Sequence, residues 1–229
     1  MITTLLIPLQ IIAIIALADF VSGIIHWAED AYGTEETPVF GRLLIRPNIV
    51  HHHYPRFFTR FTWFQSSWDL LILGVAVLAG AWAFDVLTWQ VWLFVTVSVN
   101  ANEVHKWSHR TRAENGALIS KLQDWGILQT PRHHALHHTD PKNTYYCPIT
   151  NWVNPLLEKI RFWDGLEHII QRLTGLRHRA DTSVRGQGPG PAWLSEYRPA
   201  SKGSTPAAPA SRTCCGHCAR CRHTHANAA

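Results

Sequence analysis

The chain has 229 residues, which suits one domain with an appendage, and its formal net charge of +5 is unevenly distributed. Up to Gly175 it has 13 Lys and Arg against 14 Asp and Glu, a net charge of −1, whereas from Leu176 onward it has 8 against 2, a net charge of +6. The near-neutral body argues against a nucleic-acid-binding protein, which would carry a basic stripe, and its single cysteine, Cys147, gives it no disulfide framework.

Three apolar stretches predict an all-α membrane protein with about three transmembrane helices. The first runs from Ile2 to about Ile25, which is too long for the apolar region of a signal peptide. The second (Trp68–Phe84) and the third (Val86–Val104) form a hairpin around Asp85, in a region without Lys or Arg. Asp19 lies within the first stretch, either as a functional residue inside the membrane or as an interfacial residue that reaches water.

Three spans would place the N-terminus and the Asp85 turn on one side of the membrane. Residues 29–65 and everything from His105 onward would lie on the other side, together with every Lys and Arg of the chain. The positive-inside rule then predicts a multi-pass protein with its N-terminus outside and this second side in the cytoplasm.

Four histidines within six positions mark the segment from Pro131 to Asp140: His133, His134, His137 and His138. If this segment is helical, His133/His137 and His134/His138 are i,i+4 pairs, and each pair can converge on a metal. The alternative is a histidine-rich surface turn without a metal.

Further histidines lie near the same predicted membrane face. His26 and Asp30 are spaced i,i+4, either as a ligand pair or as a ligand with a carboxylate acceptor. His105 and His109 have the same spacing where the third span ends. His51, His52 and His53 are consecutive, so neighbours among them can both bind metal only on an irregular backbone or toward two adjacent metals. These histidines come from segments that are far apart in the sequence, and their common position at one membrane face favours one shared metal site.

The number and type of these residues favour two metal ions. Imidazole suits zinc, copper, iron and nickel, and eight or nine imidazoles exceed what one four-coordinate zinc requires. The chain has no HExxH motif, too few Glu-x-x-His repeats for a ferritin-like centre, and no dinucleotide-binding glycine motif. Two irons that activate O2 against a C–H bond of a lipid, with electrons from a separate protein, agree with this pattern.

The body resembles the Kua-type lipid desaturase family, which includes plasmanylethanolamine desaturases and a plastid desaturase of palmitate in phosphatidylglycerol. The resemblance covers about residues 20–180 and includes His26-Trp27-Ala28-Glu29-Asp30, His105-Lys106-Trp107-Ser108-His109, Leu122-Gln123-Asp124-Trp125 and Tyr146-Cys147. It implies a phospholipid substrate, O2, two irons and an electron donor such as a cytochrome or a ferredoxin. It assigns Asp30 a catalytic position beside the metal ligands, which are His26, His51, His52, His105, His109, His134, His137 and His138, with His133 added from the plasmanyl branch.

Two positions depart from the plasmanyl branch of that family. This chain has Phe61 where those proteins have a histidine, and His53 where they have an isoleucine, so His53 can be a compensating ligand. The match at His133 favours a plasmanyl ether lipid, converted to a vinyl ether. The alternatives are desaturation or hydroxylation of a phospholipid acyl chain, a non-catalytic membrane regulator, and a histidine-rich metal-binding or transport protein. A metal transporter is less favoured because transporters place their ligands near the bilayer midplane, whereas these histidines gather at one membrane face.

The remaining sequence predicts an interfacial helix and a tail. Asn154 to Gly175 has the apolar spacing of one amphipathic helix lying on the membrane. We expect residues 1–178 to form the membrane-embedded domain and residues 179–229 to form a disordered basic tail. Within that tail, Cys218-x-x-Cys221 with His223 or His225 has a spacing usable for zinc, against the alternative of an incidental sequence.

Overall fold

A computed structural model describes residues 2–186 and 190–198, with side chains described from Leu6 onward. Over these ranges the chain forms helices joined by loops and contains no strand, which confirms the predicted all-α class. The Cys/His segment from Cys214 to His225 lies outside the described residues, so its predicted zinc binding stays a prediction.

Two helices are long and apolar enough to cross a membrane. Helix α1 (Ile2–Tyr32) contains a candidate span of 27 residues, and α3 (Trp63–Ala83) contains one of 21 residues. Large apolar side chains such as Leu9, Ile72 and Trp82 are exposed on them, as expected for contact with lipid. The first two predicted apolar stretches are therefore helical and membrane-compatible.

The third predicted span is interrupted. Helix α4 (Trp89–Val99) has 11 residues and ends at Asn100, after which the chain continues as α5 (Ala101–Ser108). Eleven helical residues rise about 16 Å, about half of the hydrocarbon thickness of a bilayer. The three-span topology therefore stays a prediction.

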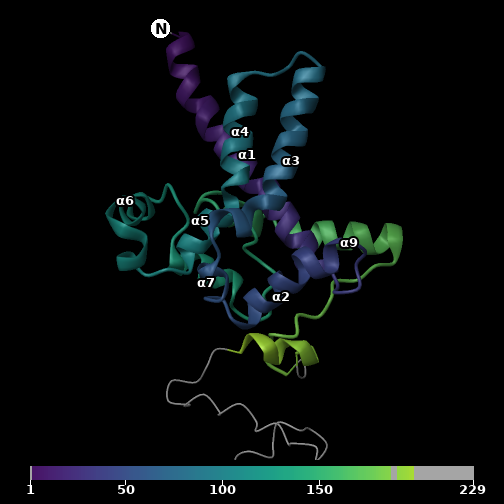
Figure 1. Ribbon diagram of the computed structural model, residues 1–229. Helices are drawn as coiled ribbons and strands as arrows, with labels where there is room; N and C mark the ends of the chain where they lie inside the picture. Colours follow the sequence, from purple (N-terminus) through teal and green to yellow (C-terminus); the bar gives the residue numbers. More distant parts are fainter. Residues whose placement is uncertain (1, 187–189, 199–229) are drawn as a thin grey trace, which may run out of the picture. The chain divides into compact units, whose positions relative to one another are not determined.

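The long helices lie beside one another at one end of the body. Helix α4 packs against both α1 and α3, and a Cβ added to Gly74 of α3 would lie 2.7 Å from Val99 Cγ2, so the absence of a side chain at this glycine allows the close approach. Figure 1 shows the N-terminal end of α1 at the same end as the α3–α4 connection, with α2 (Arg46–His53), α5 and α7 (Pro131–His137) at the opposite end. These last three helices carry most of the predicted ligands.

Local capping signals set where two important helices begin. The Thr62 hydroxyl accepts a hydrogen bond from the Gln65 backbone N–H (3.3 Å), and the Gln65 side chain accepts one from the Thr62 N–H (2.9 Å), which starts α3. Thr130 accepts a hydrogen bond from the His133 N–H (3.2 Å) and is followed by Pro131, which starts α7. The histidine cluster is therefore helical.

The predicted single helix from Asn154 to Gly175 is wrong. The structure has two helices there, α8 (Val153–Lys159) and α9 (Phe162–Thr174), because Arg161 adopts a left-handed backbone with φ 52°. The break lets Trp163 turn inward, 2 % exposed, where its ring stacks on Trp27 at 6.0 Å. Helix α9 keeps an exposed apolar side that includes Ile169 and Leu173.

The remaining described elements are short. They comprise a π-helical turn (Gly41–Ile45), two 3-10 turns (Phe58–Arg60 and Ala192–Tyr197) and α6 (Arg112–Asp124). Residues 179–186 lie against the body, where the Arg179 N–H donates to the Ala31 carbonyl at 2.6 Å. The domain boundary at residue 178 stays a prediction.

Candidate metal centre

Eight predicted histidines and Asp30 gather into two neighbouring groups of metal-ligand type. Within each group, one ligand atom per residue lies within 4.8 Å of the others. We call them group A (His51, His105, His109, His134 and His138) and group B (His26, Asp30, His52 and His137). Helices α2 and α7 contribute to both groups, α1 contributes to group B and α5 to group A; His109 and His138 directly follow α5 and α7.

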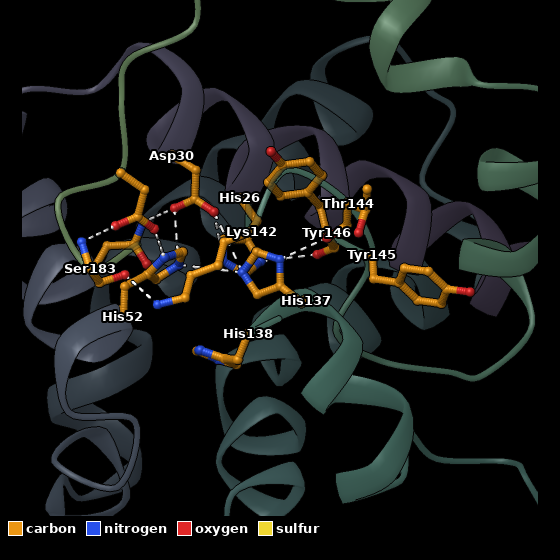
Figure 2. A network of polar contacts seen from close by, with 12 residues as sticks. His26, Asp30, His52, His137, His138, Lys142, Thr144, Tyr145, Tyr146 and Ser183 are labelled. Atoms are coloured by element: carbon orange, nitrogen blue, oxygen red, sulfur yellow. Dashed lines mark hydrogen bonds and ion pairs between the residues drawn. The ribbon is translucent and has the colours of Figure 1, made fainter. Parts of the chain in front are cut away.

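Group B is centred on the Asp30 carboxylate. The Nε2 atoms of His52, His137 and His26 lie 3.3, 3.5 and 3.6 Å from its oxygens. Asp30 is 4 % exposed, and its Oδ1 also accepts a hydrogen bond from the Asn48 amide at 2.5 Å. Figure 2 shows Asp30 and these imidazoles facing one another.

Each imidazole of group B is oriented through its other ring nitrogen. His26 Nδ1 lies 3.0 Å from the Tyr146 carbonyl oxygen, and His137 Nδ1 lies 2.8 Å from that of Thr144. His52 Nδ1 lies 2.6 Å from Asp181 Oδ2. A proton on each Nδ1 leaves the Nε2 lone pair directed into the group, which is the arrangement that metal-binding histidines commonly adopt.

Group A consists of imidazoles alone. The His134 Nε2 lies 2.9 Å from that of His105 and 3.1 Å from that of His138, and His109 Nε2 lies 3.3 Å from that of His105. His51 is 3 % exposed, and neither of its ring nitrogens has a hydrogen-bond partner among the described residues. Buried nitrogens without partners are costly unless a ligand satisfies them.

The electrostatics of group A favour neutral imidazoles. Burial, together with the neighbouring histidines, lowers the pKa of His51, His105 and His134 well below the ordinary value. Burial and other imidazoles lower the pKa of His109 to about 3. Neutral imidazoles carry the lone pairs that a metal needs, so these side chains require no proton release before binding.

His52 differs from these residues. Although burial lowers its pKa, the charges of Asp30 and Asp181 raise the pKa of His52 to about 9. A metal that binds His52 at neutral pH would therefore displace a proton, while the two carboxylates would offset part of the metal charge.

The donor set fits two metal ions. Two nitrogens that each lie about 2.1 Å from one ion are separated by about 3.0–3.4 Å, close to the nitrogen separations of group A. Group A offers five nitrogens and group B offers three nitrogens with a carboxylate, the mixture that suits iron or zinc better than magnesium or calcium. The unpartnered atoms include His26 Nε2 and Asp30 Oδ2 as well as both His51 nitrogens.

His53 and His133, both of which the sequence offered as ligands, lie outside both groups. The ring of His133 packs on Tyr145, with centroids 5.2 Å apart, and its Nε2 lies 3.4 Å from the Asn154 amide. His53 Nε2 lies 3.0 Å from the Thr182 hydroxyl. The geometry therefore gives neither residue a place among the candidate ligands. His53 does not take the place of the histidine that the plasmanyl branch has at the position of Phe61.

Sequence reasoning missed Asp181, which contacts a candidate ligand from a segment that was predicted to be disordered. Although burial raises it, the hydrogen bond with His52 holds the pKa of Asp181 below its usual range. One signal was present in the sequence, since Asp181 is one of only two acidic residues in the basic region from Leu176 onward. The carbonyls of Thr144 and Tyr146 give no such signal, because every residue has a carbonyl.

A pocket of about 140 Å³ lies beside the two groups. His26, His51 and His105 form part of its wall, and Leu43, Phe58, Phe61 and Trp68 contribute apolar and aromatic surface. A lipid segment in this pocket would therefore lie against both groups while being shielded from water.

Comparisons with known proteins agree with this arrangement. Residues 15–181 match the family model described as a lipid desaturase domain. The chain is 35 % identical over 189 residues to plasmanylethanolamine desaturase 1 of Mus musculus, covering 76 % of this chain and 69 % of that protein. It is 36 % identical over 173 residues to a plasmanylethanolamine desaturase of Myxococcus xanthus, covering 72 % of this chain and 60 % of that protein.

A plastid relative is nearly as similar. Fatty acid desaturase 4, chloroplastic, of Arabidopsis thaliana is 32 % identical over 183 residues, covering 79 % of this chain and 55 % of that protein. No solved structure matches the chain. The family match spans more than half of the chain and includes every residue of both groups, so this chain belongs to the lipid desaturase family.

Proposed function

We propose that this protein is an O2-dependent desaturase that converts a plasmanyl ether phospholipid into its vinyl ether. The observation that carries the proposal is the pair of adjacent ligand groups, eight imidazoles and one carboxylate, beside a partly apolar pocket whose wall includes His26, His51 and His105. One catalytic zinc takes three protein ligands, so nine donors in two adjacent groups suit two metal ions, and imidazole with a carboxylate is a donor set that iron accepts.

The reaction balances with O2 and an external reductant. A CH2–CH2 segment loses two hydrogen atoms and becomes CH=CH. Two electrons and two protons from outside complete the reduction of O2 to two molecules of water. Two irons held by groups A and B would supply the activation of O2 that this reaction requires. The electron donor would be a separate protein such as a cytochrome or a ferredoxin, because the sequence carries no dinucleotide-binding motif.

The residues of the chain would position and shield this chemistry. The Tyr146 and Thr144 carbonyls and Asp181 hold the rings of His26, His137 and His52, so that their Nε2 atoms stay directed inward. Asp30 contributes negative charge at the centre of group B and is itself held by Asn48. Phe58, Phe61 and Trp68 line the pocket and exclude water from the reacting carbons.

The ether-lipid substrate is supported by the relatives. The two plasmanylethanolamine desaturases are 35 % and 36 % identical to this chain, and the plastid fatty acid desaturase is 32 % identical. Because these values are close, desaturation of a phospholipid acyl chain is the second candidate. In the ether lipid the reacting carbons follow the ether oxygen, whereas in the second candidate they lie within an acyl chain.

We further propose that the two groups face the cytoplasm and that the N-terminus lies outside. Every Lys and Arg follows residue 41 and none lies between Ser66 and Val104, so the basic residues lie with the histidines. A short protease-sensitive tag at the N-terminus tests this orientation in sealed cells. Cleavage by external protease is expected, and full protection of the tag would contradict it.

Lipid mass spectrometry of cells that express the protein tests the activity. Cells supplied with a saturated ether phospholipid should accumulate a product lighter by two hydrogen atoms and sensitive to acid, as vinyl ethers are. His105→Ala should abolish it, whereas His168→Ala, at an exposed histidine outside both groups, should not. A new double bond only in acyl chains would favour the second candidate, and a purified protein that binds zinc in place of iron would contradict both.

A further inference from the structure

A buried lysine directly follows one of the candidate metal ligands. Lys106 comes after His105 on α5 and is 1 % exposed. Its Nζ lies 2.5 Å from Glu103 Oε2 and donates a hydrogen bond to the Phe61 carbonyl oxygen at 2.9 Å. Removing two charges from water is so costly that a buried ion pair is often no more stabilising than apolar residues of the same volume. What this pair does achieve is to fix the backbone at Phe61.

A second cation repeats the arrangement about one helical turn later. Arg110 directly follows His109, the other ligand of this segment, and donates a hydrogen bond to the Thr59 carbonyl oxygen at 3.1 Å. Its guanidinium also lies 3.5 Å from Glu103 Oε1, so one carboxylate serves both cations. Each of the two ligands is thus followed by a cation that binds residues 57–61, which we call the phenyl turn.

The phenyl turn forms part of the pocket wall. Phe58 and Phe61 both line the pocket, and their ring centroids are 6.4 Å apart. The ring of Phe58 also lies against two imidazoles of group A, with its centroid 5.3 Å from that of His51 and 5.2 Å from that of His105. A lipid chain that lies in the pocket against group A would therefore also lie against these phenyl rings.

The phenyl turn is weakly held by its own backbone. The three hydrogen bonds that close it, donated by the N–H groups of Thr59, Arg60 and Phe61, are each 3.3 Å long, beyond the usual range for such bonds. Short 3-10 turns of this kind have poor hydrogen-bond geometry. Hydrogen bonds from charged donors are about twice as strong as neutral ones. The contacts with Lys106 and Arg110 are therefore the main restraints on the turn.

We propose that Lys106 and Arg110 are positioning residues that hold the phenyl turn against group A, so that its two rings select which lipid carbons lie nearest the metal ligands. The proposal rests on the proposed function. A chain that slips along the pocket by one carbon brings a different C–H bond to the two groups. A wall held rigidly in place resists this slip, whereas a loosely held ring can move aside.

Hydrogen exchange of the purified protein in nanodiscs tests these contacts without turnover. Lys106→Met and Arg110→Gln each remove a charged donor, so backbone exchange in the phenyl turn should become about tenfold faster. Lys106→Arg keeps the charge and should restore most of the protection. Lys159→Met, the same change at an exposed position of α8, is the matched control and should leave this exchange unchanged.

Two further points of design keep this measurement decisive. The Arg110 side chain is 24 % exposed, so Arg110→Gln tests the proposal even where the buried Lys106→Met fails to fold. Iron content would be measured in every variant, because both cations directly follow candidate ligands.

The position of the double bond in the product tests the selection of carbons. Cells that express each variant would be supplied with a saturated ether phospholipid, and the double bond would be located by ozonolysis with mass spectrometry. The wild-type protein should give one positional isomer. Lys106→Met, Arg110→Gln, Phe58→Leu and Phe61→Leu should each raise the share of isomers in which the double bond is displaced along the chain. Lys106→Met combined with Phe61→Leu should displace it no more than Phe61→Leu alone, because both changes act through the same ring.

Several results would overturn the proposal. If exchange in the phenyl turn keeps the wild-type rate in both Lys106→Met and Arg110→Gln, the cations do not hold the turn. If the turn loosens but every variant still gives the single wild-type isomer, its rings do not select the carbons. If both variants lose iron, the cations act on the ligands and not on the turn.

Failure of the proposed function gives a different result. If the wild-type protein leaves a hydroxyl group in place of the double bond, the desaturase assignment fails, and the position of the hydroxyl then tests the selection of carbons in the same way. If the wild-type protein oxidises no lipid, the proposed function and the selection of carbons both fail, while the exchange measurement still shows whether Lys106 and Arg110 hold the turn.

Discussion

His51 and His52 are adjacent in the sequence, but their imidazoles belong to different ligand groups. The His51 ring lies 4.6 Å from that of His109 and 4.8 Å from that of His138, both in group A. The His52 Nε2 lies 3.3 Å from Asp30 Oδ1 in group B. Successive residues of a helix point about 100° apart, so α2 supplies one ligand to each group. His137 and His138 divide in the same way at the end of α7.

This division predicts that the two groups can be weakened separately. His51→Ala removes one of five donors from group A, and His52→Ala removes one of four from group B. We expect His52→Ala to lower the iron content from about two toward one per chain, and His51→Ala to cause a smaller loss, because four imidazoles remain. Iron per purified chain, measured by elemental mass spectrometry, checks this. His168→Ala is the control, and equal loss of both irons in both variants would contradict two separable groups.

Asp181 should act as a positioning residue for His52. Asp181→Asn weakens the acceptor that orients the ring, so we expect metal affinity to fall by about 10–100-fold, the usual effect of losing such a partner. Asp181→Glu should restore part of it. The measurement is the iron retained against increasing concentrations of a competing chelator. Asp124→Asn, which affects an exposed ion pair with Arg112, should leave the retention curve unchanged. A wild-type curve for Asp181→Asn would exclude the role.

Asp19 should be essential for stability, because it holds the loop after Cys147. Its carboxylate is fully buried and accepts hydrogen bonds from the Ile149 N–H (2.7 Å), the Thr150 N–H (2.9 Å) and the Thr150 hydroxyl (2.6 Å). Asp19→Ala leaves three buried donors without an acceptor and should destabilise the protein by about 2–4 kcal/mol. Thermal unfolding in detergent measures this. Asp19→Asn keeps one oxygen acceptor, so its melting temperature should lie between those of the wild-type protein and Asp19→Ala. Equal melting temperatures for these three proteins would refute the role.

Gly23 should be intolerant of any side chain. An added Cβ would lie 2.5 Å from Cys147 Sγ and 3.1 Å from Cys147 Cα, in the segment whose Tyr146 carbonyl orients His26. Gly23→Ala should therefore lower both the melting temperature and the iron content. Gly80→Ala is the matched control, because nothing lies within 4 Å of its added Cβ and alanine favours a helix by up to about 1 kcal/mol. The prediction fails if both variants melt at or above the wild-type temperature with full iron.

Local patterns in the sequence were sufficient to identify the two long apolar helices and most of the candidate ligands. Apolar length predicts α1 and α3, and the pairs His26/Asp30, His105/His109 and His134/His138 follow from helical periodicity, which depends only on neighbouring residues. Thr130 and Pro131 place the start of α7 for the same reason.

The tertiary structure decided which of these residues face one another. His133 and His137 share the spacing of the other pairs, but only His137 enters a group, because periodicity defines a face of a helix and not what packs against it. The left-handed Arg161 divides the predicted interfacial helix so that Trp163 can be buried. Asp181 reaches His52 across 129 positions of the chain. The sequence by itself therefore determined which residues are candidate metal ligands, whereas their partition into two groups and their supporting partners depend on long-range packing that no local pattern encodes.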